Sequence, residues 1–598
     1  MTTALGHLVV EGLGSIRHVE LDLSTDVTVL IGANGSGKSN LVSALELVSR
    51  IWDDSFQEYL RRRGGVDNLL FEGEQTRADR ILITLMSGFD ERDTRNGYRV
   101  ALRPDEVTGS GLAELHEWLL FQAGHEWHRP YEKNLGFGSR SRVRDITESE
   151  GSGKLPNFAR YVRPILEGCR VFHFDDVSGH APVKGWSTVG DDLALRSDAE
   201  NIAAYLHRVS REHPGHYKRI VAAIRRVTPF FDDFVLRPDP SERIRLRWKQ
   251  RGLDRTFLAR EASDGTLRFI CLATLLLGPD LPATVVLDEP ELGLHPAAID
   301  LLAEMARVAG RNGHRVLLAT QSVPLVSHPL RPGRDRRPRQ GRRRHGGLAS
   351  RRGVPRGFPG ELLHGQPVGD ESPRGTPRER GANPVKQVFI LVEGQTEEVI
   401  VNDVLVPPAR ARGFVLTPTV VITSATPTGV HRGGGGWRQY DIRLRSLLGA
   451  SHVHRVGLLI DYYQYPQGAP GYGTAGSGTQ RQRDLMHALR THYLDSRFRP
   501  LVVLHEIEAL VLAAIDAGKG DDLLPAKGLA GLRRDITRAG GPEQVDHGPA
   551  TSPSKRLGKV DPNYIKTVTG PLLIAKAGLG AILNRCPTFA AWWQDLLS

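Results

Sequence analysis

Hydrophobic positions in the first half of the chain form short apolar runs, several of which end at glycine or acidic residues. Val27 to Ile31 has the pattern of a buried strand, and Asn40 to Arg50 has the spacing of a helix. Thr284 to Leu287 predicts a second buried strand, and Phe269 to Leu277 predicts an apolar helix. We therefore expect an α/β domain in this half of the chain.

The region between these strands has a mixed pattern. Arg80 to Met86 alternates as a half-buried strand does, whereas Asp198 to Arg226 contains helical stretches. This predicts a small β-subdomain and a helical lobe. No heptad repeat lies between Lys38 and Ser263, so long coiled-coil arms are not expected.

The pattern restarts at Val388 to Val392, a fully apolar strand, and a helix is expected to follow as far as about Val406, where Pro407 would end it. Strands and helices alternate along the rest of the chain, which predicts an α/β domain with a parallel sheet. The expected strands are Thr419 to Ile422, Val456 to Ile460 and Pro500 to Leu504, and the expected helices include Trp437 to Leu448 and Gln480 to Tyr493.

A segment without apolar periodicity separates the two halves. Residues 329–384 contain 14 arginines, 11 glycines and nine prolines, a composition that cannot form a hydrophobic core. We predict a disordered linker here, between a domain at 1–328 and a domain at 385–598. Two alternatives stay open: a basic tether that follows phosphates, and an out-of-frame translation that joins two neighbouring genes.

Composition narrows the class of protein. A chain of 598 residues with 40% hydrophobic and 25% charged positions is a multidomain globular protein, not a fibrous or wholly disordered one. The formal charge of +11 suggests nucleic acid as a partner, although residues 329–384 supply +9 of it. Three scattered cysteines, Cys169, Cys271 and Cys586, exclude a disulfide framework or a zinc site.

Two features that the sequence lacks bear on where in the cell the protein is expected. No run approaches the ~18 consecutive apolar residues of a membrane span. The first residues lack the basic start and apolar block of a secretory signal. We therefore expect a cytoplasmic protein without membrane contact.

The sequence GANGSGKS at 32–39 has the pattern of a phosphate-binding loop, because it lies between a predicted strand and a predicted helix. Its glycines let backbone N–H groups face phosphate oxygens, Lys38 would reach the β- and γ-phosphates, and Ser39 would hold Mg²⁺. The predicted nucleotide-binding residues are Gly32, Asn34, Gly35, Gly37, Lys38, Ser39 and Asn40.

Two acids end the strand at 284–287. Asp288 is placed to bind magnesium through water, and Glu289 is placed to polarise the attacking water in phosphoryl transfer. Ser263 or Asp264 is suited to cap the apolar helix at 269–277, whose N-terminus would then be an anion site. A plain helix cap is the alternative interpretation of that segment.

Together these residues resemble the ABC-type ATPase heads of the RecF and SMC superfamily, over residues 5 to 328. The resemblance implies ATP and Mg²⁺ as cofactors, and it implies that Ser263 and Gly265 complete the nucleotide site of a second protomer. A homodimer or higher oligomer is therefore expected. The stretch ATQS at 319–322 looks like the switch segment of that family, but Gln321 replaces the usual histidine, so we expect slow hydrolysis.

Acids also follow three predicted strands of the second domain: Glu393, Asp461, and Glu506 with Glu508. In a parallel sheet these positions share the edge where α/β folds place their sites. Converging carboxylates suit Mg²⁺, which can clamp a phosphodiester and activate water. The alternative is that these acids are simply exposed at strand ends.

The motif VEGQTEE and the later Asp461 resemble the acidic motifs of TOPRIM domains and, more closely, a bacterial family of uncharacterised TOPRIM-like proteins. The resemblance implies that Glu393 binds metal or acts as general base, that Glu397 assists, and that Asp461 completes the site with Glu506 or Glu508. Typical TOPRIM domains have Asp-x-Asp where this chain has Asp461 to Tyr463, so a second aspartate ligand is lacking there.

Basic residues gather near the end of the chain. Lys555, Arg556, Lys559 and Lys566 lie near Tyr564, in a pattern that suits contact with phosphates and bases or, alternatively, a solvated helix face. Nucleic acid, DNA or RNA, is therefore a predicted partner.

Two function classes follow from this pattern. In the first, an ATP-dependent dimer of heads controls a metal-dependent nuclease, an arrangement that resembles the ATPase and TOPRIM pairs of anti-phage defence. In the second, a RecF-like DNA-repair ATPase or scaffold carries a C-terminal domain that only binds a partner.

Overall fold

The computed structural model describes residues 4–322 and 386–598, apart from gaps at 33–34, 54, 75, 105–112, 125–128, 149–153, 427–428, 433–435, 464 and 546–550. These described residues belong to one compact unit. The predicted linker at 329–384 and the predicted ligand Asn34 lie outside them.

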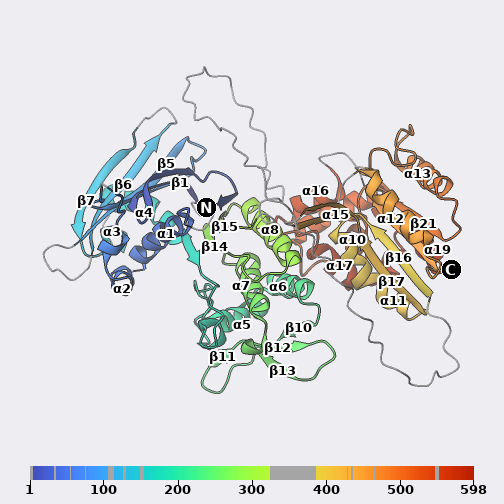
Figure 1. Ribbon diagram of the computed structural model, residues 1–598, viewed down its shortest axis with the longest axis horizontal. Helices are drawn as coiled ribbons and strands as arrows, with labels where there is room; N and C mark the ends of the chain where they lie inside the picture. The colour runs from blue at the N-terminus through green and yellow to red at the C-terminus, as the bar shows by residue number, and fades with distance from the viewer. Residues whose placement is uncertain are drawn as a thin grey trace, which may run out of the picture. The chain divides into compact units, whose positions relative to one another are not determined.

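Four parallel strands form the central sheet of the N-terminal domain, in the order β3-β15-β14-β8. Figure 1 labels the two inner strands, β14 and β15. They are β3 (Val27–Ile31), β8 (Cys169–Phe172), β14 (Thr284–Asp288) and β15 (Arg315–Thr320). The strands predicted at 27–31 and 284–287 are confirmed. β8 and β15 complete the sheet on either side of β14.

Alternate residues of β14 enter two different cores. Val285 and Leu287 pack with α7 (Asp264–Leu277) and α8 (Pro296–Arg311), whereas Val286 packs with α1 (Lys38–Trp52). A short strand that is apolar on both faces is what a sheet covered on both sides requires. The sheet therefore lies between α1 on one face and α7 with α8 on the other.

A six-stranded antiparallel sheet packs in the same core as α1, in the order β2-β1-β4-β5-β6-β7. Its strands are β1 (Leu5–Leu13), β2 (Ile16–Asp22), β4 (Ile81–Ser87), β5 (Thr94–Pro104), β6 (Ala113–Ala123) and β7 (Tyr131–Gly138), with α2 (Phe56–Arg62), α3 (Arg142–Glu148) and α4 (Lys154–Gly168) beside it. This is the predicted β-subdomain, larger than the alternation at 80–86 indicated.

The predicted helical lobe consists of α5 (Ile202–Glu212) and α6 (Pro214–Val227), which pack against α7. Pro214 stands in the first turn of α6, where a missing N–H costs nothing. Short antiparallel strands complete the lobe: β9 (Trp186–Thr188), β10 (Phe231–Phe234), β11 (Arg243–Arg245), β12 (Arg247–Gln250) and β13 (Thr256–Leu258).

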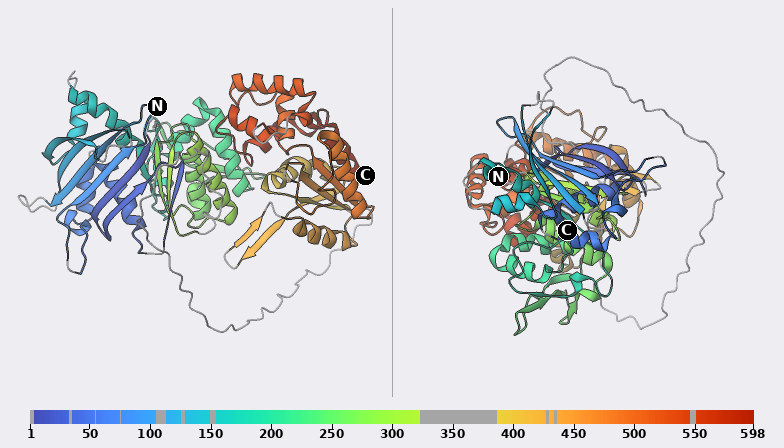
Figure 2. Two further views of the ribbon diagram at one scale, coloured as in Figure 1. Left: turned by 90° about the horizontal axis from the view of Figure 1, so that it is seen from above. Right: turned by 90° about the vertical axis from the view of Figure 1, so that its left-hand side faces the viewer.

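The C-terminal domain is built on a parallel sheet, in the order β17-β16-β20-β21, as the strand and helix alternation predicts. The strands are β16 (Lys386–Val392), β17 (Phe414–Val420), β20 (Arg455–Asp461) and β21 (Phe498–Val503). A two-stranded ribbon, β18 (Ile422–Thr426) and β19 (Gly429–Arg432), stands apart from this sheet (Figure 2).

Helices cover both faces of this sheet. Ile390 of β16 packs into a core formed mainly by the C-terminal helices, and Leu391 packs against α12 (Trp437–Gly449) and α13 (Gly478–His492). Trp593 is 1% exposed in the first of these cores. The C-terminal helices are α14 (Ala509–Asp516), α15 (Ala526–Ala539), α16 (Pro553–Val560), α17 (Thr569–Ala577), α18 (Leu579–Leu583) and α19 (Pro587–Leu596).

Several predicted boundaries differ from those of the structure, among them the following two. The helix after β16 does not end at Pro407: α10 (Gln395–Ile400) passes through a π-helical turn at Val401–Leu405 into α11 (Val406–Arg410). The proline is tolerated because it falls in the first turn of α11, where its missing N–H has no partner to lose. The strand predicted at 419–422 is displaced: β17 begins at Phe414, where the chain already pairs with β16, and it ends at Val420.

Among the described residues, no helix is both long enough and apolar enough to cross a membrane. The three cysteines are free and buried.

Candidate functional site

The phosphate loop joins β3 to α1 and depends on glycine. Gly35 and Gly37 have φ of +81° and +91°, values that residues with a Cβ rarely adopt. At Gly32 a Cβ would lie 2.3 Å from the Oγ of Ser36. Because Gly37 is the N-cap of α1, the loop presents its N–H groups at the positive end of that helix.

Lys38 is folded onto this loop. Its Nζ donates to the carbonyl oxygen of Gly32 at 2.6 Å, and only 8% of the residue is exposed. The ammonium is therefore held where a phosphate would meet it. Asn40, another predicted nucleotide ligand, donates from Nδ2 to Ser15 Oγ at 2.9 Å, so its amide anchors α1 to the turn between β1 and β2.

Ser39 lies close enough to Asp288, beside the loop, to influence the pKa of its carboxyl group. Burial, and then the charge of Glu289, raises the pKa of Asp288. Its Oδ1 is buried and receives no hydrogen bond from a described residue. An unsatisfied carboxylate oxygen beside a hydroxyl fits Mg²⁺, so Ser39 and Asp288 are the residues that would hold it.

The predicted catalytic pair is in direct contact. Asp288 stands opposite Ala319 in the register of β14 and β15, so the residues that follow these strands meet. Gln321 Nε2 donates a hydrogen bond to Glu289 Oε1. Glu289 has a φ of +44°, an uncommon conformation that directs its side chain away from the strand path.

Glu291 is a site residue that the sequence analysis did not single out. Its Oε1 accepts hydrogen bonds from the Thr320 hydroxyl and from the N–H groups of Gln321 and Ser322, the latter two at 3.1 and 3.2 Å. It therefore fixes the backbone of the segment that carries Gln321. The second glutamate of the sequence DEPE is the only signal that marked it.

Ser263 caps α7, as predicted: its Oγ accepts from the Thr266 N–H at 3.3 Å. Gly265 is required by close packing, because a Cβ there would lie 2.3 Å from the carbonyl oxygen of Gly293. The start of α7 thus touches the turn that follows β14. Ser263 itself is exposed, so it is available to a second molecule.

Arg268 connects three segments of the site. It donates to the carbonyl oxygens of Phe174 at 3.2 Å, Asp175 at 2.7 Å and Leu292 at 2.8 Å. Phe174 and Asp175 follow β8, which lies beside β14 and whose short apolar run was not recognised in the sequence. Arg268 therefore ties α7 to the residues after β8 and after β14.

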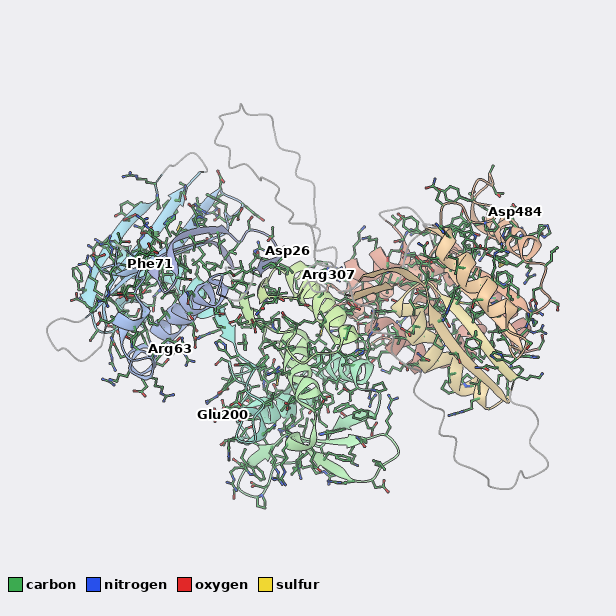
Figure 3. All side chains as sticks on the ribbon, viewed as in Figure 1. Asp26, Arg63, Phe71, Glu200, Arg307 and Asp484 are labelled. Atoms are coloured by element: carbon green, nitrogen blue, oxygen red, sulfur yellow. The ribbon has the colours of Figure 1, made fainter. Side chains whose placement is uncertain are left out.

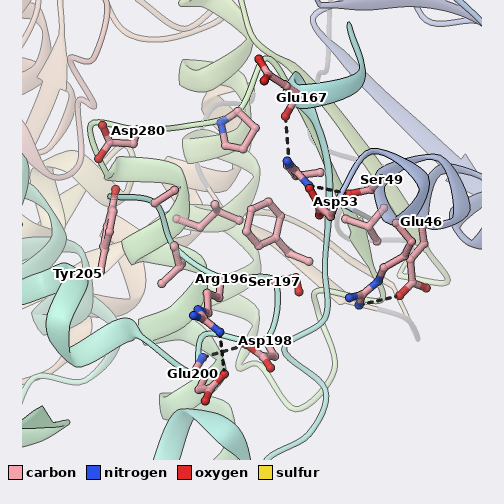
Figure 4. A pocket seen from close by; sticks show the side chains of 18 of the residues that line it. Glu46, Ser49, Asp53, Glu167, Arg196, Ser197, Asp198, Glu200, Tyr205 and Asp280 are labelled. Atoms are coloured by element: carbon pink, nitrogen blue, oxygen red, sulfur yellow. Dashed lines mark hydrogen bonds and ion pairs between the residues drawn. The ribbon is translucent and has the colours of Figure 1, made fainter. Parts of the chain in front are cut away.

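A cleft of about 740 Å³ lies beside α1, and none of the predicted site residues lines it. Its charged side chains are paired, as Figure 4 shows around Glu46 and Asp53: Arg50 approaches Glu46 at 3.4 Å, and Arg170 lies 2.5 Å from Asp53. Six acids and four arginines line the cleft, so it has no excess of positive charge that would favour an anion.

The C-terminal domain brings three predicted carboxylates to one edge of its sheet. Glu393 follows β16, Asp461 ends β20, and these strands are neighbours. Glu393 and Asp461 lie close enough to influence each other's pKa, and Glu397 Oε2 accepts from the Gly394 N–H at 2.9 Å. The carboxylates therefore converge instead of facing unrelated surfaces.

Their pKa values reflect this crowding. Burial, and then the charge of Glu397, raises the pKa of Glu393 to about 7. Burial, followed by Glu397, Glu393 and Glu508, raises the pKa of Asp461 well above its usual range. Like charges in a buried cluster favour protonation, or a cation that offsets them.

The structure distinguishes the two glutamates that follow β21. Glu506 uses both oxygens to accept from Ser554, Oε2 from the N–H at 2.9 Å and Oε1 from the hydroxyl at 3.0 Å. Glu508 is fully buried, and among the described residues its charge is compensated by Lys566, whose Nζ lies 2.9 Å from Oε1.

The carboxylates suit a metal by chemistry but not by position. Carboxylate oxygens are the ligands that Mg²⁺ prefers, and those of Glu508 are buried. Within the described ranges, however, no group of three or more His, Cys, Asp or Glu side chains is arranged to hold a metal ion. The cation found at this cluster is instead the ammonium of Lys566.

The predicted nucleic-acid contact surface near Tyr564 is wrong in part. Tyr564 is only 4% exposed and cannot stack on a base. Arg556 pairs with Asp535 at 2.6 Å, and Lys566 faces Glu508. The sequence showed their charge but not the acids that tertiary packing places beside them.

Tyr440 is a further residue of the carboxylate site that the sequence did not reveal. Its hydroxyl is buried without a hydrogen bond from the described residues. Burial, and then the charges of Glu393 and Glu397, raises its pKa. Helix α12 was predicted, but the face that it turns toward the carboxylates could not be.

Comparison with known proteins gives two family matches. A family model described as "AAA domain, putative AbiEii toxin, Type IV TA system" matches residues 27–327. A second model, described as a domain of unknown function (DUF4276), matches residues 392–597 and names no TOPRIM fold, so the TOPRIM interpretation stays a prediction. No curated protein matches the chain.

Solved structures of SMC heads are similar to this chain, with low TM-scores. The SmcHead bound to the C-terminal winged-helix domain of ScpA has 13% identity and a TM-score of 0.36, over 54% of this chain and 91% of that one. The Smc head of Pyrococcus furiosus has 14% identity and a TM-score of 0.36, with the same coverage. The SMC head of Thermotoga maritima has 15% identity and a TM-score of 0.28, again with that coverage. Scores of this size support no inference about function.

Proposed function

The chain belongs to the AAA-domain family described as putative AbiEii toxin, Type IV TA system, and from that premise we propose that it is an ATPase whose ATP-dependent dimer controls a nuclease. The nuclease is the carboxylate site of the C-terminal domain, acting on a phosphodiester of DNA or RNA. The observation that carries the proposal is that each domain gathers its reactive residues at the carboxyl edge of its own parallel sheet.

The ATPase chemistry follows from the residues around the phosphate loop. Lys38 neutralises phosphate charge, and Ser39 and Asp288 would hold the Mg²⁺ that would supply further charge stabilisation when bound. Glu289 accepts the proton of the attacking water, and Gln321 orients that glutamate through its hydrogen bond. Gln321 cannot carry a charge, which favours slow turnover.

Dimerisation is proposed from the start of α7. Ser263 is exposed there, at a helix N-terminus that attracts anions. A second head that presented these groups to the γ-phosphate would make ATP part of the interface. The proposal is tested by size exclusion of the Glu289→Gln protein, which should elute as a dimer with ATP and as a monomer without it.

The nuclease chemistry rests on Glu393. A carboxyl group with a pKa of about 7 is suited to accept a proton near neutral pH. Asp461 and Glu508 are the nearby acids that would hold Mg²⁺, which would activate water and offset phosphate charge when bound.

The biological setting that we propose is defence against phage. The name of the matched family, a putative toxin of a Type IV TA system, supports a role in which the C-terminal activity harms the cell's own or foreign nucleic acid. A toxin of this kind must stay inactive until it is triggered, which is consistent with control by ATP.

A second function is favoured by one observation. No described group of three carboxylates, histidines or cysteines is arranged for a metal, so the C-terminal domain would serve as a scaffold that binds a partner. A scaffold predicts nucleic-acid or protein binding that survives Glu393→Ala without any cleavage. Fluorescence anisotropy with labelled DNA and tRNA, run beside a cleavage gel, distinguishes the two functions.

A further inference from the structure

Two segments that carry residues of the C-terminal carboxylate site are hydrogen-bonded to the ATPase domain. The residues that hold them are Arg226 on α6 and Asp300 and Glu304 on α8, which we call the grip. The two acids are four residues apart on one face of α8, the helix on which Figure 3 labels Arg307.

The first contact holds the segment between Glu393 and Glu397, the first acidic motif of the C-terminal domain. Gln395 lies between Glu393 and Glu397 in the sequence, and its side chain is bound at both ends. Arg226 Nη2 donates to Gln395 Oε1 at 2.8 Å, and Gln395 Nε2 donates to Asp300 Oδ2 at 2.8 Å. The backbone that carries the first two carboxylates is therefore fixed to the ATPase domain.

The second contact holds the segment 565–568, which carries Lys566. Thr567 Oγ1 donates to Glu304 Oε2 at 2.5 Å, and Arg226 Nη1 donates to the Thr567 carbonyl oxygen at 2.7 Å. Ile565 and Val568, on either side, are 1% and 3% exposed in the core that also contains α7 and α8. Lys566 is thus held between two residues anchored in the ATPase domain.

α8 links this grip to the nucleotide site. The helix begins at Pro296, directly after the turn 289–294 that carries Glu289 and Glu291. A rigid helix transmits a displacement at its first turn to Asp300 and Glu304 within its second and third turns. A change at the catalytic turn therefore reaches Gln395 and Thr567 without an intervening loop.

We propose that the ATPase domain keeps the carboxylate site closed by holding Lys566 beside Glu508, and that ATP-driven movement of α8 releases the segment 565–568. This inference rests on the proposed function, since it assigns a regulation to the same site. The ammonium occupies the place of a divalent cation, which explains why these carboxylates converge yet form no metal-binding group. Release of Lys566 leaves Glu508 uncompensated, and a divalent cation then restores the charge balance.

The first test measures Mn²⁺ binding by electron paramagnetic resonance in the nucleotide-free full chain carrying Lys38→Ala. Binding that is lost in Asp461→Asn defines the C-terminal site. Removing the ammonium with Lys566→Met should tighten that binding about tenfold or more, because two cations no longer repel each other there. The control Lys527→Met removes an exposed lysine of α15 and should leave the affinity unchanged. Equal affinities for the two variants would overturn the proposal.

The second test follows hydrogen exchange of the N–H groups at 565–568 in the Glu289→Gln chain. ATP should speed exchange of this segment several-fold as the grip opens. With Thr567→Val, which removes the bond to Glu304 at similar volume, exchange should be fast before ATP is added. A chain that binds ATP but shows unchanged exchange at 565–568 would overturn the coupling.

These results distinguish a failure of the proposed coupling from a failure of the proposed function on which it rests. A chain that binds no ATP, or binds no Mn²⁺ that depends on Asp461, contradicts the proposed function and the coupling together. A chain that binds both, without the Lys566 and Thr567 effects, contradicts the coupling alone.

Discussion

At the scale of single residues, the two sites use opposite arrangements of charge. Lys38 and the phosphate loop form a positively charged site suited to an anion. Glu393, Asp461 and Glu508 form a negatively charged site suited to a cation. Each site is completed by one contact between side chains: Gln321 to Glu289 in the first, and Lys566 to Glu508 in the second. Both contacts can be removed by single substitutions.

The first prediction concerns Lys38 and Glu289. Lys38→Ala should abolish ATP binding, because the ammonium that meets the phosphates is lost. Glu289→Gln should keep ATP binding but lower turnover about a hundredfold or more, since the group that accepts the proton of water is neutral. Equilibrium dialysis and phosphate release measure the two effects. Normal turnover by Glu289→Gln would exclude this glutamate as the base.

The second prediction concerns pH and Glu393. Its folded pKa of about 7 is above the ordinary value of 4.5, so the folded state binds this proton more tightly than the unfolded chain does. The resulting stabilisation is complete below pH 4.5 and is lost as the pH rises to 7, a loss of about 3 kcal/mol. Glu393→Gln should remove that loss.

Urea unfolding of both proteins at pH 5 and pH 8 measures this effect. The difference in unfolding free energy between wild type and Glu393→Gln should grow in favour of the variant at pH 8. A difference that is the same at both pH values would show that Glu393 ionises normally.

Sequence reasoning at this scale succeeded where residues follow strands and failed where they face each other across elements. Glu393 and Asp461 could be paired because parallel strands end at one edge. Lys566 and Tyr440 could not be placed at that edge, because they reach it from a loop and a helix whose orientation depends on packing. For the same reason Tyr564 was expected at a contact surface, whereas it is buried.

At the scale of elements, apolar runs predicted the strands well because β14, β16 and β20 carry runs of residues that are buried on both faces of their sheets. β3, β14 and β20 lie within one residue of their predicted bounds, and β16 begins two residues before its predicted start. Pro407 misled the prediction, since a proline that ends one helical turn can equally begin the next. β8 was missed because four residues are too few to distinguish a strand from the end of the preceding helix.

The third prediction concerns Glu291 and the segment after β15. Glu291→Ala removes the acceptor for Thr320, Gln321 and Ser322 and should free that segment. We expect turnover to fall about tenfold with little change in ATP affinity, because the phosphate loop is untouched. Steady-state kinetics separate kcat from KM. A rise in KM alone would show that Glu291 supports nucleotide binding instead.

The fourth prediction concerns the contact between α7 and the catalytic turn. Gly265→Ala places a Cβ about 2.3 Å from the Gly293 carbonyl oxygen, so one backbone must move. ATP hydrolysis and dimerisation should both weaken. Gly179→Ala is the matched control, because a Cβ there meets nothing within 4 Å. Equal hydrolysis rates for the two variants would show that the contact does not matter.

At the scale of the whole molecule, the domains on either side of the Arg-rich segment behave as one compact unit. The Arg219–Asp561 ion pair has both side chains nearly buried, 6% and 4% exposed, with Nη2 to Oδ2 at 2.5 Å. Breaking a buried pair by removing one partner costs about 3–5 kcal/mol. This packing could not be predicted from the sequence, which marked only the boundary between the domains.

The fifth prediction follows from that packing. A chain cut at a protease site introduced into 340–380 should elute as one particle, because the contacts of α6 and α8 remain. The same cut chain with Asp561→Ala should separate into two. Separation of the cut wild-type chain into two pieces would show that the contacts of α6 and α8 do not hold the domains together.

The most direct test of the account is a cleavage assay with labelled DNA and tRNA, Mn²⁺ or Mg²⁺, with and without ATP. The account predicts cleavage by the wild-type chain only when ATP is present, and none by Lys38→Ala or Glu393→Ala. Cleavage that persists in Glu393→Ala, or the absence of cleavage under every condition, would contradict it.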